Sequence, residues 1–277
     1  MAKEEFRGGG EIVDGGSFFG SSTVALAQGV RDNDRFDDRK VIHAYELGFL
    51  PEPESGQTTK SFVGQEYTFG ESFVPILETN TAPFQDLVEL NIGDLLEHEW
   101  DGRPIEICFI DVCKTAELNA HCAKQFYPHI PVGGYLINQD FFFDRLPYVK
   151  VTMGYLSDYF VWTGRVFSSS IWRCIKPVPQ SVADYDPWLA NDPMAAEYHE
   201  RCRYNGLAED AYFMLDISLA YLTAMRGDPA KAKAILRRVK AKYRKYIEYR
   251  ATVVKDGRDA QYRVDRAERQ IALGKVH

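Results

Sequence analysis

Long apolar segments are missing from this 277-residue chain. It has no run of about eighteen consecutive apolar residues, which is what a transmembrane helix needs. The opening residues, MAKEEFRGGG, lack the apolar segment of a secretory signal peptide. We therefore expect a cytoplasmic protein without a transmembrane segment.

Cysteine is scarce, and its spacing suggests no pairing. The number of cysteines is odd, they are scattered, and none of them forms a CxxC pair. Such a pattern supports neither a disulfide framework nor a structural zinc site, so we expect reduced thiols. The five cysteines are Cys108, Cys113, Cys122, Cys174 and Cys202.

Positive charge is also in deficit. The chain has 33 Lys and Arg against 40 Asp and Glu, which gives a formal net charge of −7. Binding to a large stretch of phosphate backbone usually shows as a basic domain or stripe. Nucleic acid is therefore not expected as a partner.

What the chain does contain is an alternation of strand-like and helix-like patterns. The apolar and charged residues at 11–14 and 40–47 predict strands, and residues 22–30 between them predict a helix. Further strands are predicted at 86–92, 105–112 and 133–143, with helices at 71–79 and 115–126. Five strands separated by helices predict a doubly wound parallel sheet, whose ligands bind at the carboxyl ends of the strands.

Three further segments complete the predicted organisation. Residues 161–179 predict an antiparallel pair of strands at the edge of the sheet. The polar stretch 48–70 predicts a long loop, and long loops in compact domains are often functional. The composition then becomes helical, so we expect a sheet domain at 1–180 and a helical appendage at 181–277.

The helical appendage contains a strongly apolar helix, AYFMLDISLAYLTAM, at residues 211–225. Such a helix must pack against the sheet domain, against its neighbour helix or against another subunit. Because the chain starts almost at its first strand, we expect the appendage to cover the acceptor side of the site or to make a homo-oligomer.

The stretch EIVDGGSFFGSST, residues 11–23, places an acid between a short apolar run and a glycine-rich turn. Gly15, Gly16 and Gly20 do not have the G-x-G-x-x-G spacing of a dinucleotide-binding loop. Gly15 and Gly20 have the spacing of a P-loop, but Ser21 then stands where a lysine must meet the phosphates. Both phosphate-binding loops are therefore excluded.

What remains is the pattern acid-x-Gly-x-x-x-Gly of Asp14, Gly16 and Gly20. With it, the sequence resembles the class I S-adenosylmethionine-dependent methyltransferases, whose first strand ends in such a loop. The resemblance implies that Glu46 binds the ribose hydroxyls and that Asp94 contacts adenine. The full set of cofactor-binding residues that it implies is Asp14, Gly16, Ser17, Gly20, Glu46, Asp94 and Asp111.

The segment FIDVCKTAELNAHCAKQFYPHIPVGGYLINQDFFF extends the resemblance to sugar O-methyltransferases of the macrocin O-methyltransferase-like and cephalosporin-hydroxylase-like group. The group implies a Rossmann-like, mostly parallel seven-stranded sheet with an antiparallel edge. Its fourth strand offers two acids and its fifth an acidic pair, which together bind a divalent cation. Asp111 and Asp140 match two of these acids, whereas Cys113 and Gln139 stand where the others would be. Mg²⁺ held by Asp111 and Asp140 and a site without metal both stay open.

Methyl transfer to oxygen requires alignment of the acceptor and removal of its proton. We assign catalysis to Asp111, as the base, and to Asp140; the alternative is that Asp111 caps the following helix. His121 and Lys114 lie nearby, with plainer interpretations as a structural histidine and a solvated loop lysine. The predicted function is S-adenosylmethionine-dependent O-methylation of a sugar, glycan or small natural-product hydroxyl. The alternative is a non-catalytic methyltransferase-like domain with an assembly or regulatory role.

Overall fold

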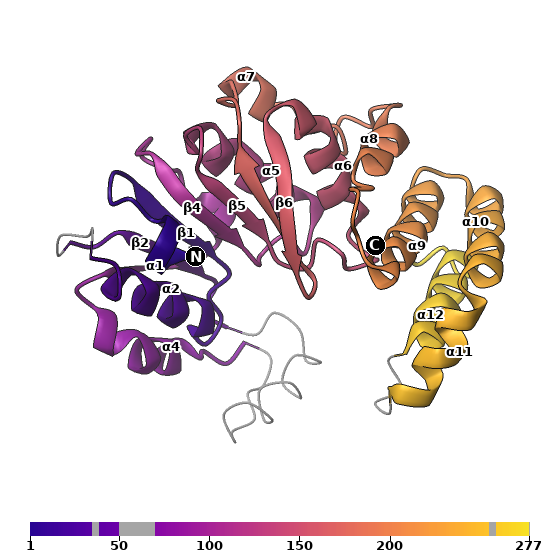
Figure 1. The fold of residues 1–277 in the computed structure, drawn as a ribbon, viewed down its shortest axis with the longest axis horizontal. Coiled ribbons are helices and arrows are strands. Elements are labelled where there is room, and N and C mark those ends of the chain that lie inside the picture. Colours follow the sequence, from indigo (N-terminus) through magenta and orange to yellow (C-terminus); the bar gives the residue numbers. More distant parts are fainter. Residues whose placement is uncertain (35–38, 50–69, 255–258, 277) are drawn as a thin grey trace.

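The computed structural model describes residues 1–34, 39–49, 70–254 and 259–276 of the chain, coloured along the sequence in Figure 1. These residues form one sheet with helices on both of its faces and a helical C-terminal region. The strands are β1 (Glu11–Gly15), β2 (Ile42–Glu46), β3 (Val88–Ile92), β4 (Ile105–Ile110), β5 (Tyr135–Asn138), β6 (Phe160–Val166) and β7 (Ser169–Cys174). The α-helices are α1 (Ala2–Glu5), α2 (Ser21–Arg31), α4 (Val74–Thr81), α5 (Ala116–Phe126), α6 (Pro147–Tyr155), α7 (Gln180–Ala183), α8 (Ala195–Arg201), α9 (Glu209–Met225), α10 (Pro229–Lys242), α11 (Arg244–Val253) and α12 (Ala260–Ala272).

The sheet has the strand order β3-β2-β1-β4-β5-β7-β6. Strands β1 to β5 are parallel, and β7 runs antiparallel to both β5 and β6. This confirms the predicted seven-stranded, doubly wound sheet with an antiparallel edge. The strand order reverses between β1 and β4, and in such sheets the crevice at the carboxyl ends of these two strands is where ligands bind.

The central strands are buried on both faces, as parallel strands covered by helices must be. In β1, Ile12 and Val13 are both fully buried but belong to different hydrophobic clusters, because successive side chains point to opposite faces. One cluster packs under α1 and α2; the other packs under α5 and α6. The two-sided core fixes the register of β1 and so the place where its chain turns toward α2.

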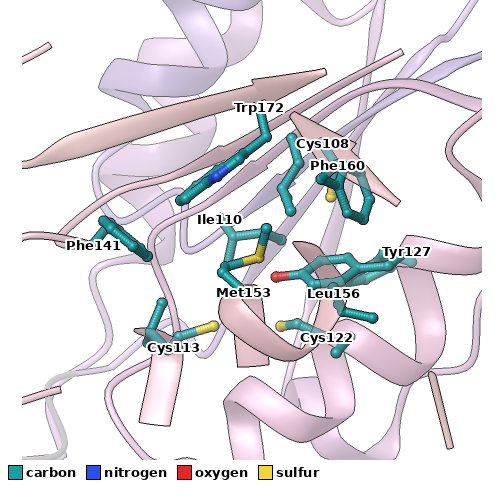
Figure 2. Packing of buried hydrophobic residues seen from close by; sticks show 14 of the residues in the cluster. Cys108, Ile110, Cys113, Cys122, Tyr127, Phe141, Met153, Leu156, Phe160 and Trp172 are labelled. Carbon is teal, nitrogen blue, oxygen red and sulfur yellow. The ribbon is translucent and has the colours of Figure 1, made fainter. Parts of the chain in front are cut away.

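Helix α5 connects β4 to β5, and its cap and its apolar spacing are the features from which the sequence predicts a helix at 115–126. Thr115 accepts a hydrogen bond from the backbone of Leu118 and so caps the helix start. Cys122 and Phe126, four residues apart, are buried against the sheet. Figure 2 shows Cys122 in a core with Tyr127, Met153 and Trp172. All five cysteines are buried free thiols, as expected.

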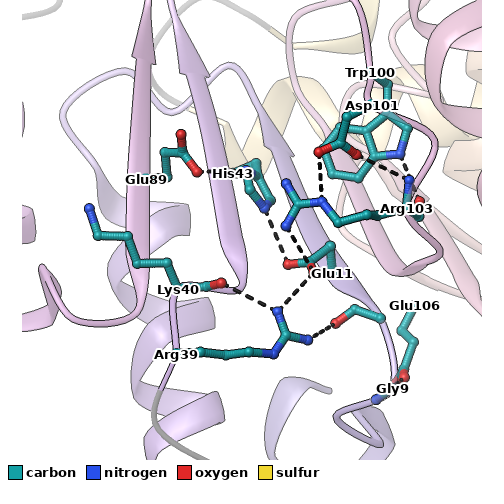
Figure 3. A network of polar contacts seen from close by, with 11 residues as sticks. Gly9, Glu11, Arg39, Lys40, His43, Glu89, Trp100, Asp101, Arg103 and Glu106 are labelled. Carbon is teal, nitrogen blue, oxygen red and sulfur yellow. Dashed lines mark hydrogen bonds and ion pairs between the residues drawn. The ribbon is translucent and has the colours of Figure 1, made fainter.

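A polar network fastens the strands at the amino edge of the sheet, opposite the predicted site (Figure 3). Glu11, at the start of β1, is 3% exposed and lies 2.8 Å from Arg39 and 3.1 Å from Arg103. Its second carboxylate oxygen lies 3.2 Å from the buried ring of His43 in β2. Since the arginines and the histidine surround a buried carboxylate, the network stabilises the sheet.

The C-terminal helices pack against the sheet layer through α6 and α8. Gly154 of α6 lies so close to α8 that a Cβ on it would meet the carbonyl oxygen of Tyr198 at 1.8 Å. Cys202 and Leu215 belong to the same hydrophobic cluster as the sheet, whereas helices α9 to α12 share a second cluster. Figure 1 shows α9 to α12 at one end of the molecule, on the side away from β2.

Most of the predicted loop at 48–70 lies outside the described residues. As for membrane insertion, none of the helices in the described ranges is both long and apolar enough to cross a bilayer.

Candidate cofactor and acceptor site

The loop after β1 makes its sharp turn at Gly16. This glycine has a φ of +94°, and a Cβ on it would lie 2.9 Å from the backbone carbonyl of Asp111. Its N–H donates to the carbonyl of Tyr45 at 3.0 Å, and Gly15 accepts from the Asp111 N–H at 2.6 Å. Gly16 is therefore required for the close approach of the β1 loop to the end of β4.

Glu46, the last residue of β2, holds the same loop from the other side. One carboxylate oxygen accepts from the backbone N–H of Phe18 at 2.6 Å, and the other accepts from Gly48 at 3.2 Å. Phe18 has a φ of +49°, a conformation that costs a non-glycine residue energy and persists only where the surroundings impose it. Burial raises the pKa of Glu46, although these backbone donors oppose the shift. The ribose contact assigned to Glu46 stays a prediction.

Asp14 lies under the loop and is fully buried. Its Oδ2 accepts from the hydroxyls of Thr23 at 2.5 Å and Ser22 at 3.0 Å, at the start of α2. Burial raises the pKa of Asp14 to about 6, against the lowering effect of these donors. Its Oδ1 is buried and has no hydrogen-bond partner within the described ranges. In this arrangement Asp14 fastens α2 to β1, and its contact with a ligand stays a prediction.

A pocket of about 470 Å³ opens above this loop, within the size range of small-molecule sites. It includes three of the predicted cofactor residues, namely Gly16, Ser17 and Asp111. Gly20 instead forms the left-handed cap of α2, with a φ of +89°. The described lining residues are Gly16, Ser17, Phe18, Phe19, Ser21, Ser22, Asn80, Phe109, Asp111 and Gln139.

Asp94 lies farther along the same edge of the sheet. It follows β3, and its carboxylate accepts from the backbone N–H of Leu96 at 3.0 Å. The Gly93 N–H donates to the carbonyl of Glu46 at 2.9 Å, so the ends of β3 and β2 are adjacent. The predicted residues thus follow the carboxyl edge in strand order, from Asp94 through Glu46 and Gly16 to the ends of β4 and β5. The adenine contact of Asp94 stays a prediction.

Asp111 and Asp140, at the ends of β4 and β5, are held together by Lys114. The lysine Nζ lies 2.7 Å from Asp111 Oδ1 and 2.7 Å from Asp140 Oδ2. Burial raises the pKa of Asp111, although the Lys114 ammonium opposes this shift. Partial burial alone would lower the pKa of Lys114, but the two carboxylates outweigh it and the pKa is raised. The Lys114 side chain is 52% exposed, as the sequence interpretation of a solvated loop lysine implies, and it also bridges both predicted catalytic acids.

The two residues that stand where the related group has acids make other contacts. Cys113 is 4% exposed and belongs to the hydrophobic core. The side-chain oxygen of Gln139 accepts from the hydroxyl of Ser169 at 2.6 Å. Throughout the described ranges, no three His, Cys, Asp or Glu side chains are grouped as metal ligands. A divalent cation does not fit this arrangement, because the Lys114 ammonium already contacts both carboxylates.

The ring of His121 lies 3.0 Å from the backbone carbonyl of His98. This contact fits the interpretation of His121 as a structural histidine. Two contributions were missed from the sequence, namely the bridge made by Lys114 and the place of Phe18 in the pocket wall. The spacing of Lys114, three residues after Asp111 and just before a helix cap, was the only signal for the first.

No family model matches the sequence, and no curated protein matches it. Among solved structures, the O-methyltransferase NovP is similar, with 16% identity, a TM-score of 0.45 and coverage of 60% of this chain and 72% of that one. Phosphoethanolamine N-methyltransferase 1 from Haemonchus contortus has 10% identity and a TM-score of 0.41, covering 69% of this chain and 46% of that one. An rRNA methylase from Streptococcus thermophilus has 12% identity and a TM-score of 0.38, covering 63% and 92%. Each of these three structures is that of a methyltransferase.

Proposed function

We propose that this chain is an S-adenosylmethionine-dependent methyltransferase that methylates a hydroxyl group of a sugar, a glycan or a small natural product. The observation that carries the proposal is the pocket at the switch point of the sheet. Its described wall includes both Gly16, at the turn after β1, and the carboxylate of Asp111, which supports a cofactor loop and a base on the same pocket.

The chemistry of the pocket wall suits this cofactor. Among the described lining residues the one charged side chain is the carboxylate of Asp111, which is paired with Lys114 at 2.7 Å. The wall also includes the rings of Phe18, Phe19 and Phe109. Aromatic faces attract cations, and S-adenosylmethionine carries both a sulfonium and an ammonium group. The rings of the pocket wall therefore suit the cationic groups of this cofactor.

When bound, S-adenosylmethionine supplies the methyl group: the acceptor oxygen forms the new O–C bond while the C–S bond breaks and its electron pair returns to sulfur. The chain must then align the acceptor and take its proton. Asp111 lines the pocket and accepts this proton. Burial raises its pKa and so makes its carboxylate a stronger base than an exposed aspartate. Asp140, joined to Asp111 through Lys114, positions the acceptor.

Product formation tests the proposal. Purified protein with labelled S-adenosylmethionine should methylate one or more members of a panel of sugar and phenol acceptors. Asp111→Asn should lower turnover on the order of 100-fold or more, far more than it lowers cofactor affinity, because a base acts in the transition state. Cofactor binding without product from any acceptor would instead support the non-catalytic alternative.

A further inference from the structure

The backbone around Lys114 is fixed on both sides. Before it, Cys113 is buried in the core and its carbonyl accepts from the Tyr148 hydroxyl at 3.4 Å. After it, Thr115 caps α5. The Lys114 N–H itself donates to the carbonyl of Val112 at 2.6 Å, which closes a tight turn. The lysine side chain therefore starts from a defined point beside the ends of β4 and β5.

From that point the ammonium reaches two carboxylates that arrive from different strands. Its Nζ lies 2.7 Å from an oxygen of Asp111 and 2.7 Å from an oxygen of Asp140. Asp140 follows Lys114 by 26 residues in the chain. Two carboxylates that share a site repel each other unless a cation lies between them. Lys114 supplies that cation from within the chain.

A magnesium ion would need more than these two carboxylates offer. Mg²⁺ takes oxygen ligands in near-octahedral geometry at about 2.0–2.1 Å. Cys113 lies in the core and Gln139 bonds to Ser169, so neither completes such a set. The metal would also have to displace a covalently attached ammonium from both of its carboxylates.

We propose that the Lys114 ammonium is the resident cation of the acceptor site, in the place of the divalent metal, and that methyl transfer by this chain is metal-independent. The inference rests on the proposed function and names the group that holds the acceptor oxygen. An ammonium has three N–H donors, and the contacts in the described ranges use two of them on Asp111 and Asp140. The third donates to the acceptor oxygen and orients its lone pair toward the methyl group.

The proton count assigns separate roles to the two groups. Lys114 keeps its proton throughout, because it acts as a donor and a fixed charge. The acceptor O–H proton passes to Asp111, whose Oδ1 is held by the lysine and whose Oδ2 receives the proton. An acceptor is thus held through a single oxygen, whereas a divalent cation binds several oxygens at once.

Metal dependence is tested first, on the unaltered protein. After treatment with EDTA, methyl transfer should be unchanged, and added Mg²⁺ or Mn²⁺ should not raise it. Mn²⁺ is then titrated into the protein without other ligands, and its binding is followed by electron paramagnetic resonance. The unaltered protein should show no Mn²⁺ site that is lost in Asp111→Asn. Loss of activity in EDTA with recovery in Mg²⁺, or an Mn²⁺ site that depends on Asp111, would overturn the proposal.

A substitution then tests the lysine itself. Lys114→Met, which keeps length but removes charge, should lower kcat on the order of 100-fold, as expected for loss of a charged donor in the transition state. Its affinity for S-adenosylmethionine should change little, and the exposed Lys233→Met in α10 serves as the control. Wild-type kcat in Lys114→Met would contradict the assignment. If the unaltered protein neither binds S-adenosylmethionine nor forms product, the proposed function fails, and the Mn²⁺ titration still decides which cation the carboxylates hold.

Discussion

Arg266 of α12 donates hydrogen bonds of 2.8 and 2.7 Å to the two oxygens of Asp144, which lies 122 residues earlier. Asp144 is fully buried, and it belongs to the segment that leads from Asp140 to α6. Lys150 of α6 donates to the carbonyls of Phe143 and Leu146 on either side of it. The last helix of the chain is thus fastened to the loop that begins at the candidate acceptor site.

Removing this arginine should be costly. Arg266→Leu leaves the buried Asp144 carboxylate with a longer ion pair to Arg263, at 3.7 Å, and the nearby charge of Lys150. Loss of one member of a buried ion pair costs roughly 3–5 kcal/mol of unfolding free energy. Urea unfolding should show this loss, whereas Arg269→Leu, exposed on the same helix, should change stability by less than about 0.5 kcal/mol. Equal effects of the two substitutions would show that the Asp144 contact does not stabilise the fold.

Asp14 should make stability depend on pH in a defined direction. Burial raises its folded-state pKa from the ordinary 3.8 to about 6, so the folded state binds the proton more tightly than the unfolded state. The protonated carboxyl group of Asp14 stabilises the folded state fully below about pH 4. This stabilisation, roughly 3 kcal/mol, is lost as the pH rises through about 6. Asp14→Asn cannot titrate. The unfolding free energy of the variant, relative to that of the unaltered protein, should therefore rise between pH 4 and pH 7. A constant difference over this range would show that Asp14 does not have a raised pKa in the folded state.

Gly16 offers a test of the close approach between β1 and β4. Gly16→Ala adds a Cβ 2.9 Å from the Asp111 carbonyl and forces a side chain into a φ of +94°. Gly206→Ala has a similar φ of +87° and no heavy atom within 4 Å, so it isolates the backbone cost of about 1 kcal/mol. Calorimetric melting should show a clearly larger loss for Gly16→Ala, together with weaker binding of S-adenosylmethionine. Similar losses would mean that the β4 end can move away at little cost.

The C-terminal helices expose apolar side chains that suit a subunit contact. Tyr249 of α11 is 62% exposed, and Leu273, at the end of α12, is 67% exposed. We expect light scattering of the full chain to give a mass above 31.6 kDa, and the double substitution Tyr249→Ser, Leu273→Ser to return it to that value. Phe167→Ser, at the tip of the β6–β7 hairpin, is the control for general loss of apolar surface. If the unaltered protein is a monomer, the expectation of a homo-oligomer is wrong.

The fold was largely predictable because its information is local. The apolar runs of β1 and β4 and the cap of α5 at Thr115 are readable along the sequence. The placement of β7 between β5 and β6 was not readable, because strand order depends on pairing between distant segments. Most of the predicted loop at 48–70 lies outside the described residues.

For the candidate site, the sequence predicted which strand ends lie together and predicted the side-chain contacts less well. Strand ends placed Asp111 and Asp140 at the same edge, but only the folded chain shows that Lys114 fills the space between them. Asp14 was assigned to a ligand from its motif, whereas the hydroxyls of Ser22 and Thr23 hold it in the structure. The contact between Arg266 and Asp144 joins segments so far apart that no local pattern announces it.

The central claim is that the pocket above Gly16 binds S-adenosylmethionine, and binding of its demethylated product tests this most directly. Isothermal titration of the EDTA-treated full chain with S-adenosylhomocysteine should give one site per chain with a Kd in the micromolar range, about −8 kcal/mol. Gly16→Ala should weaken that binding. No detectable heat with the ligand at millimolar concentration, in a folded protein, would contradict the account.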